Sequence, residues 1–179
     1  MTTPRIPPID PPYPPEMQAD FDKLMRGTPP LKLFRTVGQN PRVLSRMMAG
    51  GLLDKGSILM RHRELMILRT TARCGAEYEW GVHVAAFAVR AGLSKDECAA
   101  TTKNDAKWAD TSDGLVIRMA DSLHDTQRIE DTLWAELSAV FKPDQLIELM
   151  MLAGLYHAVS YIVNGTRVEL ETFASRFPM

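Results

Sequence analysis

Apolar residues recur at helical spacing along most of this 179-residue sequence, and the breaks between successive segments are short. The segment from Ser57 to Gly75 has its apolar stripe one helical turn apart, at Ile58, Leu65, Leu68 and Ala72. Helices that follow one another so closely leave no room for a sheet, so the chain is predicted to be all-α. The other predicted helices lie at about 16–25, 31–53 with a break at Gln39-Asn40-Pro41, 76–92, after the Ser94/Glu97 capping box, 113–127, 131–141 and 143–165.

Prolines dominate the first 15 residues, which contain seven of them. Such density favours an extended backbone over helix or strand, so residues 1–15 are predicted to form an N-terminal arm. The arm is either a flexible tail or a segment that wraps over a neighbouring subunit through Ile6, Ile9 and Tyr13. Residues 16–179 are predicted to form a single helical domain, because a chain with 45% hydrophobic residues can bury one sizeable core.

The charge balance argues against a nucleic-acid partner, because the sequence has 21 basic and 22 acidic residues and no basic surface is predicted. Arg5 is followed by proline-rich sequence instead of an apolar signal core, so a cytoplasmic location is expected. Cys74 and Cys98 are too far apart for a Cys-x-x-Cys motif and are expected to be reduced thiols that pack as small apolar residues.

The segment 143–165 is apolar on nearly every face. Because polar residues interrupt it at Glu148, His157 and Asn164, a central core helix is predicted and a membrane span is not. All-round hydrophobicity also suggests burial against another subunit. His157 and His124 are expected to be structural histidines, and Tyr156 could line a pocket beside His157.

One group of protonatable residues could carry chemistry. Glu79 and His83 are four residues apart on a predicted helix and therefore share a face, and a helical hairpin folded at Gly75 would bring Glu64 to the same side. Histidine titrates near neutrality, and a neighbouring carboxylate can orient it for general acid/base catalysis. The alternative is a solvated surface pair. A metal is not expected here, because no His-Glu-x-x-His or Glu-x-x-His pair is present, and no cofactor is expected.

The stretch RHRELMILRTTARCGAEYEWGVHVAAFAVRAGLS resembles the core of the carboxymuconolactone decarboxylase and alkylhydroperoxidase D superfamily. The peroxidase branch has the pattern Glu, eleven residues, Cys-x-x-Cys, three residues, His. Here Glu64 and His83 match its ends, whereas Ala76 and Glu79 stand at the two cysteine positions. The resemblance implies an oligomeric, all-helical bundle of the alkylhydroperoxidase D type that keeps the acid/base residues and lacks the dithiol.

The resemblance also implies the leading functional hypothesis, a cofactor-independent decarboxylase or related lyase acting on a small organic acid or lactone. Its catalytic residues would be Glu64, Glu79 and His83, with an arginine of the Glu64 helix (Arg61, Arg63, Arg69 or Arg73) holding the substrate carboxylate. The alternatives are an antioxidant peroxidase that uses Cys74 and a non-catalytic ligand-binding oligomer. The expected partners are a small-molecule substrate and other copies of the chain, as a trimer, hexamer or dimer, without nucleic acid or membrane.

Overall fold

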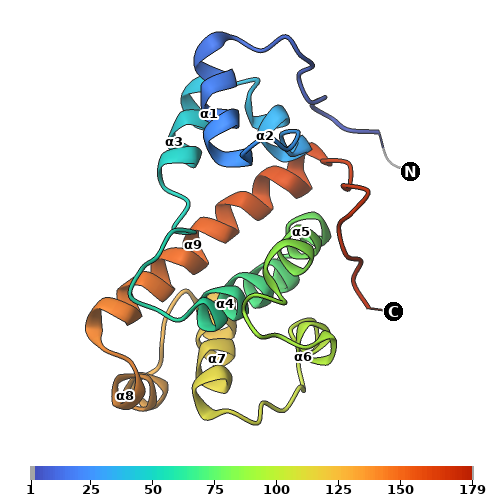
Figure 1. Ribbon diagram of the computed structural model, residues 1–179. Coiled ribbons are helices and arrows are strands. Elements are labelled where there is room, and N and C mark those ends of the chain that lie inside the picture. The colour runs from blue at the N-terminus through green and yellow to red at the C-terminus, as the bar shows by residue number, and fades with distance from the viewer. Residues whose placement is uncertain (1–2, 179) are drawn as a thin grey trace.

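The computed structural model describes residues 3–178; residues 1, 2 and 179, at the ends of the predicted arm and domain, lie outside the described residues. Within this range the chain forms nine α-helices and no strand, which confirms the all-α prediction (Figure 1). The helices are α1 Pro15–Met25, α2 Lys32–Val37, α3 Pro41–Ala49, α4 Met60–Arg73, α5 Glu77–Phe87, α6 Lys95–Ala100, α7 Thr111–Thr126, α8 Asp131–Val140 and α9 Pro143–Thr166.

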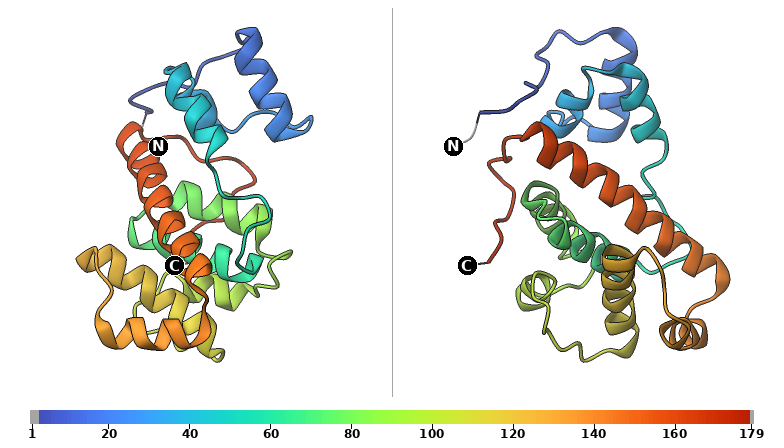
Figure 2. Two further views of the ribbon diagram at one scale, coloured as in Figure 1. Left: turned by 90° about the vertical axis from the view of Figure 1, so that its left-hand side faces the viewer. Right: turned by 180° about the vertical axis from the view of Figure 1, so that it is seen from behind.

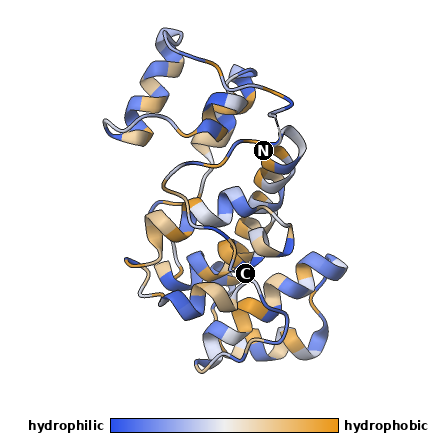
Figure 3. Ribbon diagram, turned by 90° about the vertical axis from the view of Figure 1, so that its right-hand side faces the viewer, coloured by the Kyte–Doolittle hydropathy of each residue, from blue (hydrophilic) through white to orange (hydrophobic). Residues whose placement is uncertain are grey.

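The long helix α9 runs diagonally through the molecule and links two groups of helices (Figures 1 and 2). Its N-terminal part packs with α4, α5, α7 and α8 around the larger hydrophobic cluster, which includes Leu65, Met119 and Leu149. Its C-terminal part meets a smaller cluster that α1, α2 and α3 form around Phe21 and Leu33. Hydrophobic and hydrophilic segments alternate along the helices, as expected where one side of each helix is buried (Figure 3).

Local signals in the sequence set several of the helix ends. The predicted capping box is present, with Ser94 accepting from the Glu97 backbone and the Glu97 side chain accepting from the Ser94 backbone. Gly75 has φ +62° and makes the turn between α4 and α5, a conformation that costs glycine little. The structure differs at Ser57, which was expected to start α4: its backbone N–H and hydroxyl bind the Glu148 carboxylate, and this contact with α9 holds Ser57 outside the helix.

Helix α9 is the longest helix and is buried along one side. By length and composition it could cross a membrane, and 44% of its most apolar window is buried inside the molecule. Its opposite side exposes Ile147, Met151 and Tyr161. It extends one residue beyond the expected caps, and Arg167 in the left-handed conformation ends it. Burial of the exposed side against another subunit stays a prediction.

The proline-rich arm contacts its own chain over the described residues 3–14. The Arg5 backbone N–H donates to the carbonyl of Thr166, and Ile9 exchanges two hydrogen bonds with Arg35 of α2. Tyr13 packs edge-on against Phe21 of α1, with ring centroids 5.0 Å apart. These contacts hold the arm against the smaller hydrophobic cluster and the end of α9.

The segment after α9, residues 167–178, lies along the outer side of α5 (Figure 1). The Ser175 backbone N–H donates to the Gly81 carbonyl at 3.1 Å, and Phe177 packs against Trp80 with the rings tilted by 58° and their centroids 5.2 Å apart. Arg176 forms an ion pair with Glu77. The C-terminal segment therefore covers α5 and helps to fix the helix that carries two of the predicted site residues.

The close approach at Gly81 predicts that Gly81→Ala lowers stability by about 1–3 kcal/mol, because the added methyl would stand 2.1 Å from the Ser175 carbonyl oxygen. Gly154 is the control: it is exposed within α9 and has open space at its Cβ, so Gly154→Ala should be neutral or stabilising by up to about 1 kcal/mol. Urea unfolding of both variants checks this. Equal stabilities would contradict the tight packing of the C-terminal segment.

Candidate active site

The α4–α5 hairpin brings the three predicted acid/base residues together. Glu64 Oε2 on α4 lies 2.8 Å from Nδ1 of His83 on α5, and Glu79 Oε1, one turn earlier on α5, lies 3.5 Å from Nε2 of the same ring. A carboxylate oxygen accepts, so the hydrogen of this short contact stands on Nδ1. Glu64 thereby fixes the orientation of the imidazole and leaves Nε2 as the atom that faces the remaining partners.

Tyr156 of α9 completes the cluster. Its hydroxyl lies 3.0 Å from His83 Nε2, and its ring meets the imidazole edge-on, with centroids 5.0 Å apart. The sequence predicts Tyr156 only as a possible neighbour of His157, because residue spacing does not show which face of α9 meets α5. The one sequence feature that could have pointed to Tyr156 as a site residue is its hydroxyl, which stands within an otherwise apolar helix.

The cluster is enclosed by protein. Glu64, Glu79 and His83 are 1%, 6% and 3% exposed, so the hydrogen bonds among them lie away from bulk water. Burial by itself disfavours the imidazolium, but the hydrogen bonds and charges of Glu64 and Glu79 outweigh it and raise the pKa of His83 to about 9. His83 therefore carries two N–H donors at neutral pH.

Glu79 has one carboxylate oxygen that no other described residue satisfies. Its Oε2 is buried and has no hydrogen-bond partner among residues 3–178, whereas its Oε1 faces His83. A buried acceptor without a partner is costly, and such groups in native proteins often serve a function. This oxygen is free to accept a proton or a hydrogen bond from a bound molecule. The hydroxyl of Tyr156 is the other group at Nε2, and burial followed by the nearby carboxylates raises its pKa well above the usual range.

Arg63 is the arginine of α4 that joins the cluster. Its Nε donates to Glu64 Oε1 at 2.9 Å and its Nη1 donates to the Leu53 carbonyl at 2.7 Å. The guanidinium also lies 5.7 Å from the centre of the Phe87 ring, which in turn lies 5.0 Å from His83. Phe87 is four residues after His83 on α5 and is half-buried, so it stands at the outer side of the imidazole.

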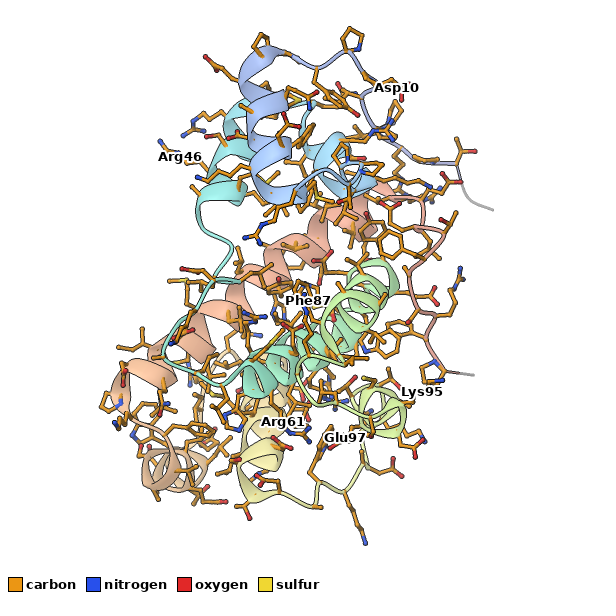
Figure 4. The ribbon with its side chains drawn as sticks, viewed as in Figure 1. Asp10, Arg46, Arg61, Phe87, Lys95 and Glu97 are labelled. Carbon is orange, nitrogen blue, oxygen red and sulfur yellow. The ribbon has the colours of Figure 1, made fainter. Side chains whose placement is uncertain are left out.

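The other three arginines weighed for this role bind elsewhere. Arg61 pairs with Glu97 and Asp113, away from Phe87 in Figure 4. Arg69 is 1% exposed and donates to Asp121 and to the carbonyls of Thr101 and Lys103. Arg73 forms an ion pair with Asp125. None of these three arginines is hydrogen-bonded to Glu64, Glu79 or His83, so Arg63 alone among the four joins the cluster.

Cys74 belongs to a different part of the molecule. Its Sγ lies 3.9 Å from Nδ1 of His124, which lies 3.0 Å from Nε2 of His157. These three residues line a surface hollow of about 550 Å³ whose lining contains none of the acid/base residues. Burial raises the pKa of the Cys74 thiol, with smaller opposing effects from Ser160 and Arg73, and a raised pKa disfavours the reactive thiolate. Ala76, at the first cysteine position of the dithiol pattern, is fully buried.

Comparisons with known proteins agree with this architecture. The sequence signature described as the carboxymuconolactone decarboxylase family matches residues 41–112, which contain the whole Glu64, Glu79 and His83 group. No curated protein matches the sequence at a significant level.

Solved structures with the same fold cover nearly the whole chain. An uncharacterized peroxidase-related protein from Silicibacter sp. TM1040 superimposes with a TM-score of 0.82 at 17% identity, over 99% of this chain and 100% of that one. A variant of the debrominase Bmp8 in complex with 2,3,4-tribromopyrrole gives 0.71 at 16% identity, over 96% and 94%. Apo Bmp8 gives 0.67 at 14% identity, over 93% and 92%. At such identities the likeness establishes the fold alone.

The raised pKa of His83 predicts a pH-dependent contribution to stability. Between the ordinary value of 6.5 and about 9, the folded chain holds a proton on His83 that the unfolded chain has lost. The free energy of unfolding should therefore fall as pH rises through this window, and the contribution should be complete below about pH 6.5. Urea unfolding at several pH values, with His83→Gln as the control that loses this component, measures the effect.

The pKa of His83 can also be measured directly by NMR. The ring protons of His83 should titrate in NMR spectra with a midpoint near pH 9. A midpoint at or below 6.5 would show that the carboxylates do not hold the imidazolium.

Proposed function

Because residues 41–112 match the signature of the carboxymuconolactone decarboxylase family, we propose that the chain is a cofactor-independent acid/base enzyme that acts on a small organic acid or lactone. The observation that carries the proposal is the buried chain of contacts from Glu64 through His83 to Tyr156, with Glu79 beside Nε2. Such a chain holds one mobile proton at a defined atom, as general acid/base catalysis requires.

His83 is proposed as the proton donor. A histidine with a pKa of about 9 is protonated at neutral pH, and Nε2–H is the donor that Glu64 leaves available. If a substrate carboxylate leaves as CO2, the electron pair of the broken C–C bond remains on the substrate as an enolate. Transfer of the Nε2 proton to the substrate carbon would complete the reaction, and the neutral imidazole would regain a proton from solvent through the Tyr156 hydroxyl.

Glu64 and Glu79 would have different roles. Glu64 holds Nδ1 and stabilises the imidazolium, so it acts as a positioning residue. Glu79 has a free oxygen within the cluster and could accept a proton or hydrogen bond from the substrate. Arg63 contributes a positive charge beside Glu64, and its remaining N–H groups are the nearest guanidinium donors for a substrate carboxylate. Phe87 marks the side from which a small molecule would reach His83.

Thiol-dependent peroxide reduction is the second candidate, and the contact between Cys74 and His124 is the observation that favours it. Against it stand the absent dithiol and the position of Cys74 in a hollow apart from Glu64 and His83. A two-cysteine peroxidase needs a second protein thiol to resolve the sulfenic acid, and Cys98 is buried within the larger hydrophobic cluster. Ligand binding without turnover by an oligomer is the remaining hypothesis.

Replacement of the proton donor should abolish the acid/base activity. With a panel of carboxylated lactones as substrates, His83→Gln is expected to lower kcat/KM by about 10²- to 10⁴-fold, the usual contribution of a general acid. Tyr156→Phe should be less damaging, because it removes the hydroxyl beside Nε2 and leaves the proton donor itself in place. CO2 release and solvent-hydrogen exchange into the substrate measure the rates.

His124→Gln is the matched control, since His124 lies in the other cluster and should leave these rates unchanged. For the parent, activity should decline above about pH 9 as the imidazolium is lost. Equal rates for parent and His83→Gln would refute the assignment of His83, and saturable binding of a lactone acid without turnover would favour the non-catalytic hypothesis.

Peroxide consumption with a dihydrolipoyl-type dithiol reductant tests the second candidate. The parent should show no turnover above background, because no resolving thiol lies beside Cys74. Cys74→Ser is the informative variant and Cys98→Ser is its control. Turnover by the parent that disappears in Cys74→Ser and persists in Cys98→Ser would replace the acid/base proposal with a one-cysteine peroxidase.

A further inference from the structure

We propose that Cys74, His124 and His157 form a binding site for a transition-metal ion, with Zn²⁺ as the expected occupant. The three side chains come from three different helices: Cys74 is the C-cap of α4, His124 lies in the last turn of α7, and His157 lies in the middle of α9. The site is separate from the acid/base cluster and uses none of its residues.

The spacing of the donor atoms fits a tetrahedral ion. The three atoms all lie within 4.8 Å of one another, with Cys74 Sγ 3.9 Å from His124 Nδ1 and His124 Nδ1 3.0 Å from His157 Nε2. Tetrahedral bonds of ordinary zinc length require about 3.6 Å between sulfur and nitrogen and about 3.3 Å between two nitrogens. The first two separations lie within about 0.3 Å of these values, and the third pair, Cys74 Sγ and His157 Nε2, would have to close by about 1.2 Å at most to place all three ligands around one ion.

The tautomer of His157 is already suited to coordination. Its Nδ1 lies 2.9 Å from the carbonyl oxygen of Ala153, and because a carbonyl only accepts, Nδ1 carries the hydrogen. The lone pair of Nε2 then points toward His124 and Cys74. Histidine ligands of metals are commonly oriented in this way by a backbone carbonyl on the other ring nitrogen. The Asn164 side chain further anchors the Cys74 carbonyl at 2.8 Å.

The charges around Cys74, His124 and His157 are compatible with a bound cation. Arg73 is the nearest arginine, and its charge is balanced by ion pairs with Asp125 and Asp121. A thiolate with two neutral imidazoles would leave a zinc complex with one net positive charge. The hollow of about 550 Å³ gives access to solvent, so water or a small ligand could occupy the fourth position.

The donor set selects the kind of metal. One thiolate and two imidazole nitrogens are ligands for zinc or copper, whereas magnesium and calcium prefer oxygen. Because each ligand comes from a different helix, an ion here would also tie α4, α7 and α9 together. Metal binding should therefore raise the thermal stability of the folded chain.

The test uses the full-length protein freed of metal with a chelator, titrated with ZnCl2 by calorimetry and with CoCl2 by absorption spectroscopy. One equivalent per chain should bind, and the cobalt form should show a thiolate-to-metal charge-transfer band together with intense tetrahedral d–d bands. Zinc should raise the Tm and protect Cys74 from alkylation. Cys74→Ser, His124→Ala and His157→Ala should each weaken zinc binding by at least about 10-fold.

Cys98→Ser is the matched control and should retain the affinity and the charge-transfer band, because Cys98 lies buried elsewhere in the larger cluster. Circular dichroism confirms that each variant is folded, and the cobalt spectrum of the parent needs no variant at all. The proposal is overturned if the parent binds no zinc, if the cobalt form is octahedral without a thiolate band, or if the band survives in Cys74→Ser.

Discussion

Pairing of buried charges on α4 determines how the other helices are arranged. Every residue from His62 to Thr71 is buried, including Glu64 and Arg69. An unpaired charge in such a position would cost several kcal/mol, so each must meet a partner from another element. Arg69 meets Asp121 of α7, and Glu64 meets His83 of α5. The helix that carries the candidate site is thus also the helix around which the larger group of helices is built.

The fold could largely be predicted from the sequence because its signals are local. Helical spacing, the Ser94/Glu97 box and the turn at Gly75 each depend on residues within a few positions, and the structure confirms them. The hairpin that joins Glu64 to the Glu79 and His83 face follows from the same turn. At Ser57, the predicted start of α4 was wrong because of a distant contact: Glu148 of α9 holds Ser57 outside α4. The helix predicted over 76–92 is shorter than expected, since α5 ends at Phe87.

The missing parts of the candidate site depend on how helices cross. Tyr156 is 73 positions from His83, and His157 is 33 positions from His124, so no spacing rule connects them. Arg63 could not be separated from the other arginines of α4, because each lies within a charged stretch and only the three-dimensional partners differ. The roles proposed for these residues follow from distances and burial, whereas oligomeric assembly stays a prediction from the exposed side of α9.

Tyr156 and His157 are adjacent in the sequence yet face different clusters, since consecutive residues of an α-helix diverge by about 100°. A single insertion or deletion within this part of α9 would rotate both side chains away from their partners at once. Relatives that keep both clusters should therefore tolerate substitutions on the exposed side, at Met151 or Tyr161, while keeping the length of the helix between Ala153 and Ser160 unchanged. The rotational register of α9 is thus a shared constraint on two otherwise separate groups of residues.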